Sequence, residues 1–276
     1  EALTVADLAE FRTLFLAEID MAMLSSGNVT RETTLTIANE LNTALLKHAK
    51  KVTVNRSDIR KLEGSSNWFE TVQVSHPDTG FTYYIQAKDK SFKTRAMTSL
   101  ISQIISTDYY SQVRTEKQLG YIVFATNFNL LKVPGIAFIV QSPTVDGITL
   151  LEETLTFLKQ QVATLENLDE TQFKRYQDAV ISKLLKKDTT LYERSNQFWS
   201  EIDDKNAEFD TKQQLVDAIS SFSVKDLNVF YNEFINHSGN ALLTYTIKED
   251  QDRKDINRTG LSHLNKLTKS SLNTFK

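Results

Sequence analysis

Two apolar segments of the chain, residues 119–128 and 135–140, are joined by a link too short to hold a helix. The link carries Pro134 and Gly135, residues that favour a turn. Parallel neighbours need a crossover of about a dozen residues or more, whereas antiparallel neighbours need only a turn. We therefore predict two antiparallel strands here, which restricts the chain to folds that contain an antiparallel sheet.

Three further segments have the alternating pattern of strands. Residues 71–74 and 82–87 flank the turn-like residues 76–80, His-Pro-Asp-Thr-Gly, and this pattern predicts a β-hairpin. Residues 240–247 follow a glycine-containing break and predict a closing strand.

Most of the remaining sequence has apolar residues every three or four positions, the spacing of an amphipathic helix. One predicted helix runs over about 4–24, with a face that we expect to be buried, and a second over 30–50 with Thr30 as its N-cap. Residues 97–105 restore a helical face, and the chain after residue 147 is almost wholly helical until the closing strand.

Two helix starts are marked by capping patterns. Asp169 and Ser223 stand at N-cap positions, with Gln172 and Asp226 at the third helical position. Only 3 prolines and 8 glycines interrupt the chain, which favours long regular elements. Because helices and antiparallel strands alternate in blocks, we predict an α+β fold in which helices pack on an antiparallel-rich sheet.

Composition excludes several classes of protein. The 276 residues are 40% hydrophobic and 24% charged, as in ordinary globular proteins, and no apolar run approaches the roughly 20 residues that span a bilayer. The net charge of -3 gives no electrostatic basis for binding nucleic acid. Since there is no cysteine, disulfides and cysteine chemistry are excluded, and periplasmic and cytoplasmic locations are both compatible.

No self-contained catalytic site is visible. A helical zinc site needs two imidazoles about one turn apart beside a carboxylate, as in His-x-x-Glu-His, but each histidine stands alone. Gly-x-Ser-x-Gly and the glycine-rich phosphate loops are absent as well. We predict no metal and no other cofactor in this chain. The isolated histidines are His48, His76, His237 and His263.

Residues 110–124 carry two polar side chains from a predicted helix end into an apolar strand. Gly120 permits another backbone to approach, Tyr121 has a phenolic hydroxyl, and Arg114 has a planar guanidinium that can hold peptide carbonyls or a carboxylate. Such groups can stabilise charge on a carbonyl oxygen when the nucleophile comes from elsewhere. From spacing alone, Arg114 is also compatible with capping a helix end, and Tyr121 with ordinary sheet packing.

The segment from Arg114 to Tyr121 reads Arg-x-x-x-Gln-Leu-Gly-Tyr. It resembles an element in the C-terminal half of pitrilysin-type (M16) zinc metallopeptidases, the group that includes insulin-degrading enzyme. The resemblance extends from residues 3–7 through Gly27 to residues 222–227, which is most of the chain. It implies an M16 peptidase (LuxS/MPP-like metallohydrolase) type domain.

The resemblance also implies a role. The chain would be the C-terminal, zinc-free region of a metalloendopeptidase, inactive alone, in which Arg114 and Tyr121 bind peptide substrate beside the scissile bond. Zinc is then expected in the N-terminal half of the same parent chain. Residues 1–26 would be a helix from the preceding domain or linker, residues 27–250 the M16-type domain, and residues 251–276 a polar tail.

A second hypothesis fits the missing metal ligands equally well. The chain would then be a catalytically silent M16-like subunit, or a binding and assembly module, like the silent partner subunits among relatives of this family. The absence of a methionine at position 1 and of a secretory signal leads us to expect a piece of a longer protein.

Overall fold

The computed structural model describes residues 3–47, 49–52, 59–248 and 264–266. The chain divides into two compact units, which we describe separately. One comprises residues 1–57 and 187–211, and the other residues 58–186 and 212–276. The second unit contains the main sheet and the segment from Arg114 to Tyr121.

The second unit is built on a sheet with the strand order β5-β6-β4-β7-β3-β8. From β5 to β7 the neighbours are antiparallel, which confirms the predicted antiparallel pair, whereas β7–β3 and β3–β8 are parallel. The fold is therefore α+β with a mixed, antiparallel-rich sheet. The strands are β3 (Trp68–Val74), β4 (Thr79–Gln86), β5 (Ile122–Asn127), β6 (Gly135–Ser142), β7 (Ala241–Lys248) and β8 (Asn265–Lys266).

The predicted hairpin between β3 and β4 is wrong in its pairing. Both strands form, and a turn at residues 75–78 joins them, but β7 lies between them. Leu243 of β7 is opposite both Phe69 of β3 and Tyr83 of β4. The residues of β7 that face the helices, such as Leu243 and Ile247, are buried in the core. A local sequence pattern does not show this long-range insertion.

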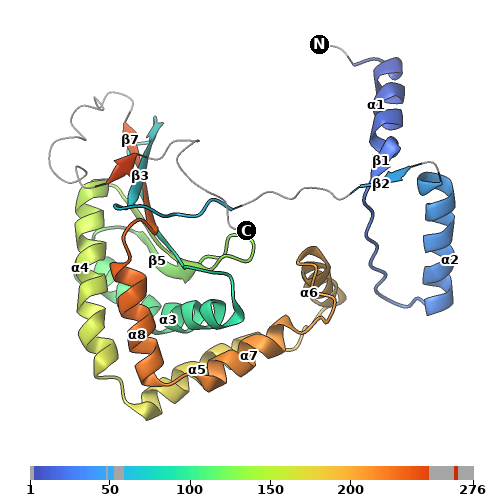
Figure 1. The fold of residues 1–276 in the computed structure, drawn as a ribbon. Coiled ribbons are helices and arrows are strands. Elements are labelled where there is room, and N and C mark those ends of the chain that lie inside the picture. Colours follow the sequence, from blue (N-terminus) through green and yellow to red (C-terminus); the bar gives the residue numbers. More distant parts are fainter. Residues whose placement is uncertain (1–2, 48, 53–58, 249–263, 267–276) are drawn as a thin grey trace. The chain divides into compact units, whose positions relative to one another are not determined.

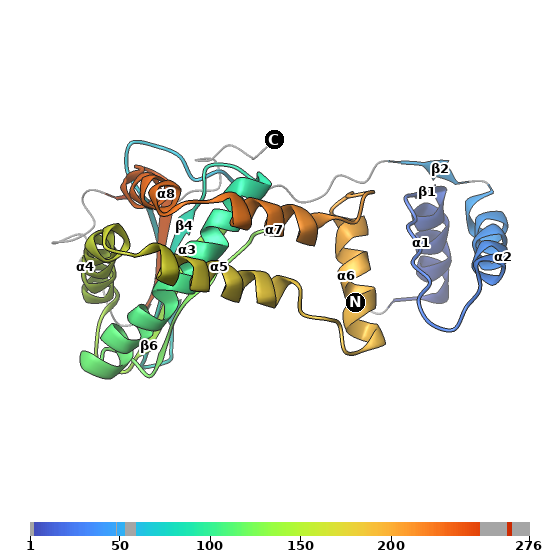
Figure 2. The ribbon, with the colours of Figure 1, turned by 90° about the horizontal axis from the view of Figure 1, so that it is seen from below.

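Helices cover one face of the sheet (Figure 1). Figure 2 shows α5 and α7 alongside one another, and the Gln177 amide of α5 donates to the carbonyl oxygens of Ile219 (2.6 Å) and Phe222 (3.1 Å) at the end of α7. The helical elements are α3 (Phe92–Tyr110), the π-helical turn η2 (Ser111–Glu116), α4 (Gly147–Glu166), α5 (Glu170–Leu184), α7 (Thr211–Ser221) and α8 (Val224–Asn236).

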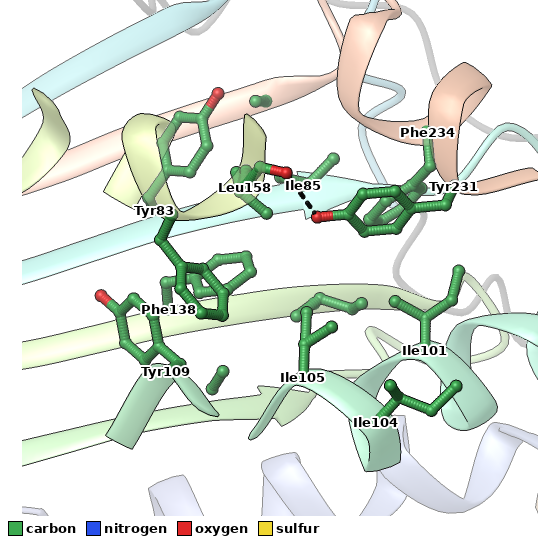
Figure 3. Packing of buried hydrophobic residues seen from close by; sticks show 14 of the residues in the cluster. Tyr83, Ile85, Ile101, Ile104, Ile105, Tyr109, Phe138, Leu158, Tyr231 and Phe234 are labelled. Atoms are coloured by element: carbon green, nitrogen blue, oxygen red, sulfur yellow. Dashed lines mark hydrogen bonds between the residues drawn. The ribbon is translucent and has the colours of Figure 1, made fainter. Parts of the chain in front are cut away.

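The core between the helices and the sheet is rich in aromatic side chains. The ring of Tyr109 in α3 lies edge-to-face against Phe138 of β6 and Phe157 of α4, with centroids 5.0 and 5.1 Å away. The buried hydroxyl of Tyr231 in α8 donates to the carbonyl oxygen of Leu158 in α4 at 2.9 Å (Figure 3). This bond fixes the spacing of two helices that cover the sheet.

Removing the Tyr231 hydroxyl should destabilise the fold measurably. We expect Tyr231→Phe to lower the free energy of unfolding by about 1 kcal/mol, because the substitution deletes one buried hydrogen bond and keeps the ring. Urea denaturation of the full chain measures the change. Tyr110→Phe is the matched control, since the Tyr110 ring is half exposed. Equal midpoints for the two variants would contradict the expectation.

The predicted helix starts in this unit are confirmed. The Asp169 carboxylate accepts a hydrogen bond from the Gln172 N–H (2.8 Å) and begins α5. Ser223 and Asp226 form a reciprocal capping box at the start of α8. Both patterns are local, so they could be recognised without knowledge of the tertiary fold.

The smaller unit contains two helices near the N-terminus and α6. The first helix begins at the predicted position, with Thr4 and Asp7 in a capping box, but it ends at Ala17 rather than near Leu24. None of its residues is buried, so the predicted burial of its apolar face is wrong for the described chain. The elements are α1 (Val5–Ala17), β1 (Glu18–Ile19), α2 (Arg31–Leu41), η1 (Asn42–Leu46), β2 (Lys50–Lys51) and α6 (Leu191–Asp203).

The proposed division at residues 26 and 250 stays a prediction. The boundaries of the compact units differ from the predicted ones. Residues 187–211 belong to the same compact unit as the N-terminal segment, residues 1–57. Most of the predicted polar tail, residues 251–276, lies outside the described residues. The described part of it, residues 264–266, includes β8, which extends the sheet next to β3.

Candidate functional site

The sheet presents an open face at the end where β5 begins. Along β5, Val123 and Ala125 face the helices and are buried, whereas Ile122 and Phe124 point to the opposite face and are 41% and 42% exposed. Among the strands that the structure describes, β5 is at the edge of the sheet and pairs with β6 alone. An exposed sheet edge with apolar side chains is a common place for an extended peptide to bind.

Tyr121 lies at the start of this edge strand. Its backbone N–H donates to the carbonyl oxygen of Gln141 on β6 at 3.0 Å, and its side chain is 46% exposed. The preceding Gly120 is in very close contact with β6, because a Cβ atom there would lie 2.6 Å from the same Gln141 oxygen. The interpretation of Gly120 as a site of close backbone approach is therefore confirmed.

The Tyr121 hydroxyl is held by a carboxylate from another strand connection. It donates to Oδ2 of Asp78 at 2.6 Å, and the Gln141 side-chain amide donates to the same oxygen at 3.1 Å. Asp78 belongs to the turn before β4. Gln141 lies opposite both Gly80 of β4 and Ile122 of β5, so the sheet register brings the three side chains together.

This hydrogen bond shifts the proton affinities of both partners. The bond from Tyr121 lowers the pKa of Asp78, and partial burial opposes that shift. The same bond raises the pKa of Tyr121. At neutral pH the carboxyl group is thus ionised and the phenol keeps its proton, which is the arrangement of a charge-assisted hydrogen bond.

Arg114 lies in η2, where α3 continues as a π-helical turn before the chain enters β5. The turn is anchored to α4 through Gln112, which donates to Gln160 at 3.0 Å, and through an ion pair between Lys117 and Glu153. The Arg114 side chain is half-buried. Across the described ranges of the chain, its guanidinium makes no hydrogen bond or ion pair.

The link from η2 to β5 has an unusual backbone. Gln118 has a φ of 52°, a left-handed conformation that residues other than glycine rarely adopt. The Leu119 N–H donates back to the carbonyl oxygen of Val113 at 2.9 Å and closes the link. π-helical turns and left-handed residues are often found at functional sites, since folding alone does not favour them.

Of the two predicted site residues, Tyr121 belongs to a polar cluster. Arg114 makes no hydrogen bond or ion pair within the described residues. Tyr121 contacts Asp78 and Gln141, two residues that sequence reasoning missed as functional candidates. In the sequence, Asp78 is part of a predicted turn, and Gln141 follows a predicted strand. The sequence carries no spacing signal for this cluster, because its members come from three strand segments that only the register aligns.

The described histidines do not form a metal site. The His76 ring accepts a hydrogen bond from the Asp78 N–H at 3.2 Å, and His237 follows α8 as its C-cap. His48 and His263 lie outside the described residues. Among the residues that the structure describes, no group of three or more His, Cys, Asp or Glu side chains is placed to hold a metal ion, and no helix is long and apolar enough to cross a membrane.

The sequence of this chain is similar to parts of several known peptidases. Residues 100–199 match a family described as PQQ synthase PqqF-like, C-terminal lobe domain 4. Insulin-degrading enzyme of Drosophila melanogaster is 26% identical over 267 residues, which cover 94% of this chain and 27% of that protein. This chain spans about a quarter of the length of the curated relatives that it matches.

Solved structures share the fold. The crystal structure of pitrilysin superposes with a TM-score of 0.77 at 20% identity, over 91% of this chain and 27% of that chain. A peptidase M16 inactive domain from Pseudomonas fluorescens superposes with a TM-score of 0.57 at 14% identity, over 88% of this chain and 57% of that chain. The predicted M16-type fold is confirmed.

Proposed function

Because the chain is homologous to the C-terminal region of M16 peptidases of the insulin-degrading-enzyme and pitrilysin type, we propose that it is the non-zinc part of a metalloendopeptidase. In this role it closes a chamber and holds peptide substrate with Arg114 and Tyr121. Cleavage belongs to the zinc-bearing N-terminal half of the parent chain. The observation that carries the proposal is Arg114, whose guanidinium makes no hydrogen bond or ion pair within the described residues.

The N–H donors of the Arg114 guanidinium are not used within the described residues, so they are available to a ligand. A peptide carbonyl or carboxylate would be a suitable acceptor, since the guanidinium presents several N–H donors in a fixed plane. The exposed edge of β5 follows directly after the link from η2. An extended peptide along this edge would therefore lie close to the segment that carries Arg114 and Tyr121.

The described residues do not fit a zinc ion, because no suitable set of ligands is grouped among them. We therefore assign this chain no hydrolytic step. Its contribution is to bind the peptide and orient it, which lowers the barrier by fixing the reacting bond in position. The proposed partners of this chain are therefore the peptide substrate and the zinc-bearing half of the same parent chain.

A complementation experiment tests this function. The chain is purified alone, then mixed with the N-terminal part of the parent that ends before Glu1, and hydrolysis of a fluorogenic peptide is followed. We expect no turnover from either part alone and peptidase activity from the mixture. A stable complex of the two parts without turnover would contradict the proposal.

That contrary result would favour the second candidate, a catalytically silent binding or assembly module. The observation on its side is the structural likeness to the inactive M16 domain of Pseudomonas fluorescens. The likeness supports a shared fold, and the two candidates make opposite predictions for turnover in the mixture.

A further inference from the structure

The Asp78 carboxylate joins three strand segments at the open end of the sheet. It precedes β4, accepts the Tyr121 hydroxyl from β5 at 2.6 Å, and accepts the Gln141 amide from β6 at 3.1 Å. Both bonds end on the same oxygen, Oδ2. The turn that carries Asp78 is itself fixed, because the Thr246 hydroxyl of β7 accepts a hydrogen bond from the Gly80 N–H at 2.8 Å.

The bond from Tyr121 to Asp78 has the length of a strong interaction. An O–H···O⁻ contact of about 2.5–2.7 Å is typical of charge-assisted bonds, which are roughly twice as strong as neutral ones. An ordinary carboxyl group is far more acidic than a phenol, so the proton stays on Tyr121. The phenol is the donor and the carboxylate the acceptor at neutral pH.

Within the described residues, the bond to Asp78 is the contact that fixes the Tyr121 hydroxyl. The Tyr121 side chain is nearly half exposed, and no further hydrogen bond of its hydroxyl is found among the described residues. A free aromatic side chain would lose rotational freedom on binding a peptide, which weakens the interaction. A side chain that is already held in one orientation avoids this loss.

We propose that Asp78 is a positioning residue that fixes the hydroxyl of Tyr121 at the edge of the sheet, with Gln141 as a second support. The proposal rests on the proposed role of Tyr121 in holding peptide. Asp78 would then act on the substrate indirectly, by orienting the phenol of Tyr121.

A double-mutant cycle in the full-length parent measures the coupling. We expect Asp78→Ala to lower kcat/KM by about 3- to 10-fold when Tyr121 is present, which corresponds to one lost hydrogen bond. In a Tyr121→Phe background the same substitution should change kcat/KM by less than about twofold, because the bond is already absent. Ser75→Ala, in the same turn, is the matched control and should leave kcat/KM unchanged.

A second measurement does not depend on activity. The full chain labelled with ¹³Cζ-tyrosine is titrated by NMR, and the Tyr121 signal is assigned by its loss in Tyr121→Phe. Because the Asp78 bond raises the pKa of Tyr121, we expect Asp78→Ala to move that pKa down towards the ordinary phenol value. Ser75→Ala should leave it in place.

The outcomes separate this inference from the proposed function. An equal loss of kcat/KM from Asp78→Ala in both backgrounds would overturn it, since the effect would then be merely structural. An unchanged Tyr121 pKa in Asp78→Ala would overturn it as well. If Tyr121→Phe alone leaves kcat/KM intact, the substrate-holding role of Tyr121 fails, and the titration still decides whether Asp78 holds the ring.

Discussion

Replacing Arg114 with alanine in the full-length parent should lower kcat/KM for peptide hydrolysis by about 1–4 kcal/mol of transition-state stabilisation. The guanidinium makes no hydrogen bond or ion pair in the described part of the chain, so its truncation breaks no polar contact there. The loss should therefore appear in kinetics and leave the unfolding midpoint nearly unchanged. Steady-state kinetics and urea denaturation of the same preparation check both expectations.

Arg175→Ala is the matched control for this prediction. Arg175 is an exposed arginine of α5 that likewise makes no hydrogen bond or ion pair within the described ranges, so the two substitutions remove the same group and differ in position. Arg114→Lys should give an intermediate loss, because lysine keeps the charge but lacks the planar arrangement of donors. Equal kcat/KM for Arg114→Ala and Arg175→Ala would remove Arg114 from substrate binding.

The elements that could be predicted from sequence are those set by local chemistry. The capping side chains at Asp169 and Ser223 lie within one helical turn of their partners, so both helix starts were recognised correctly. The antiparallel pairing of β5 and β6 follows from a short link in the same way. In each case the decisive contact lies within a few residues along the chain.

Predictions that depended on distant partners were less successful. The insertion of β7 between β3 and β4 joins residues more than 150 positions apart, such as Phe81 and Tyr245, and the local alternation of β3 and β4 indicated only a direct hairpin. Helix α1 is another example. The helix forms as its spacing predicts, but its apolar residues are not gathered on one face, and Phe11 and Phe15 are exposed in the described chain.

The candidate site shows the same division. Arg114, Gly120 and Tyr121 are neighbours in sequence, and their motif was sufficient to select them. Asp78 and Gln141 join the cluster only because Gln141 lies opposite Gly80 on one side and Ile122 on the other. That register is a property of the assembled sheet, so a single sequence could not reveal the carboxylate that holds Tyr121.

The close approach at Gly120 leads to the second large effect. We expect Gly120→Ala to lower the free energy of unfolding of the full chain by about 1–3 kcal/mol, because an added methyl group has no space in this contact. The new Cβ would lie 2.6 Å from the Gln141 carbonyl oxygen and 2.6 Å from Cγ1 of Val140, so β5 must move away from β6. Tyr121 is the next residue and would move with it.

Gly80→Ala separates this effect from the general consequence of adding a methyl group to the sheet. Gly80 is opposite the same Gln141 from the other side of β6, and its nearest contact for a Cβ is Thr246 Cγ2 at 3.4 Å, a distance that a small shift relieves. In the parent, Gly120→Ala should also lower kcat/KM, whereas Gly80→Ala should keep most of it. Equal unfolding midpoints for both variants would show that the edge strand adapts to the extra atom. The position of Tyr121 would then depend on Asp78 rather than on the spacing of the two strands.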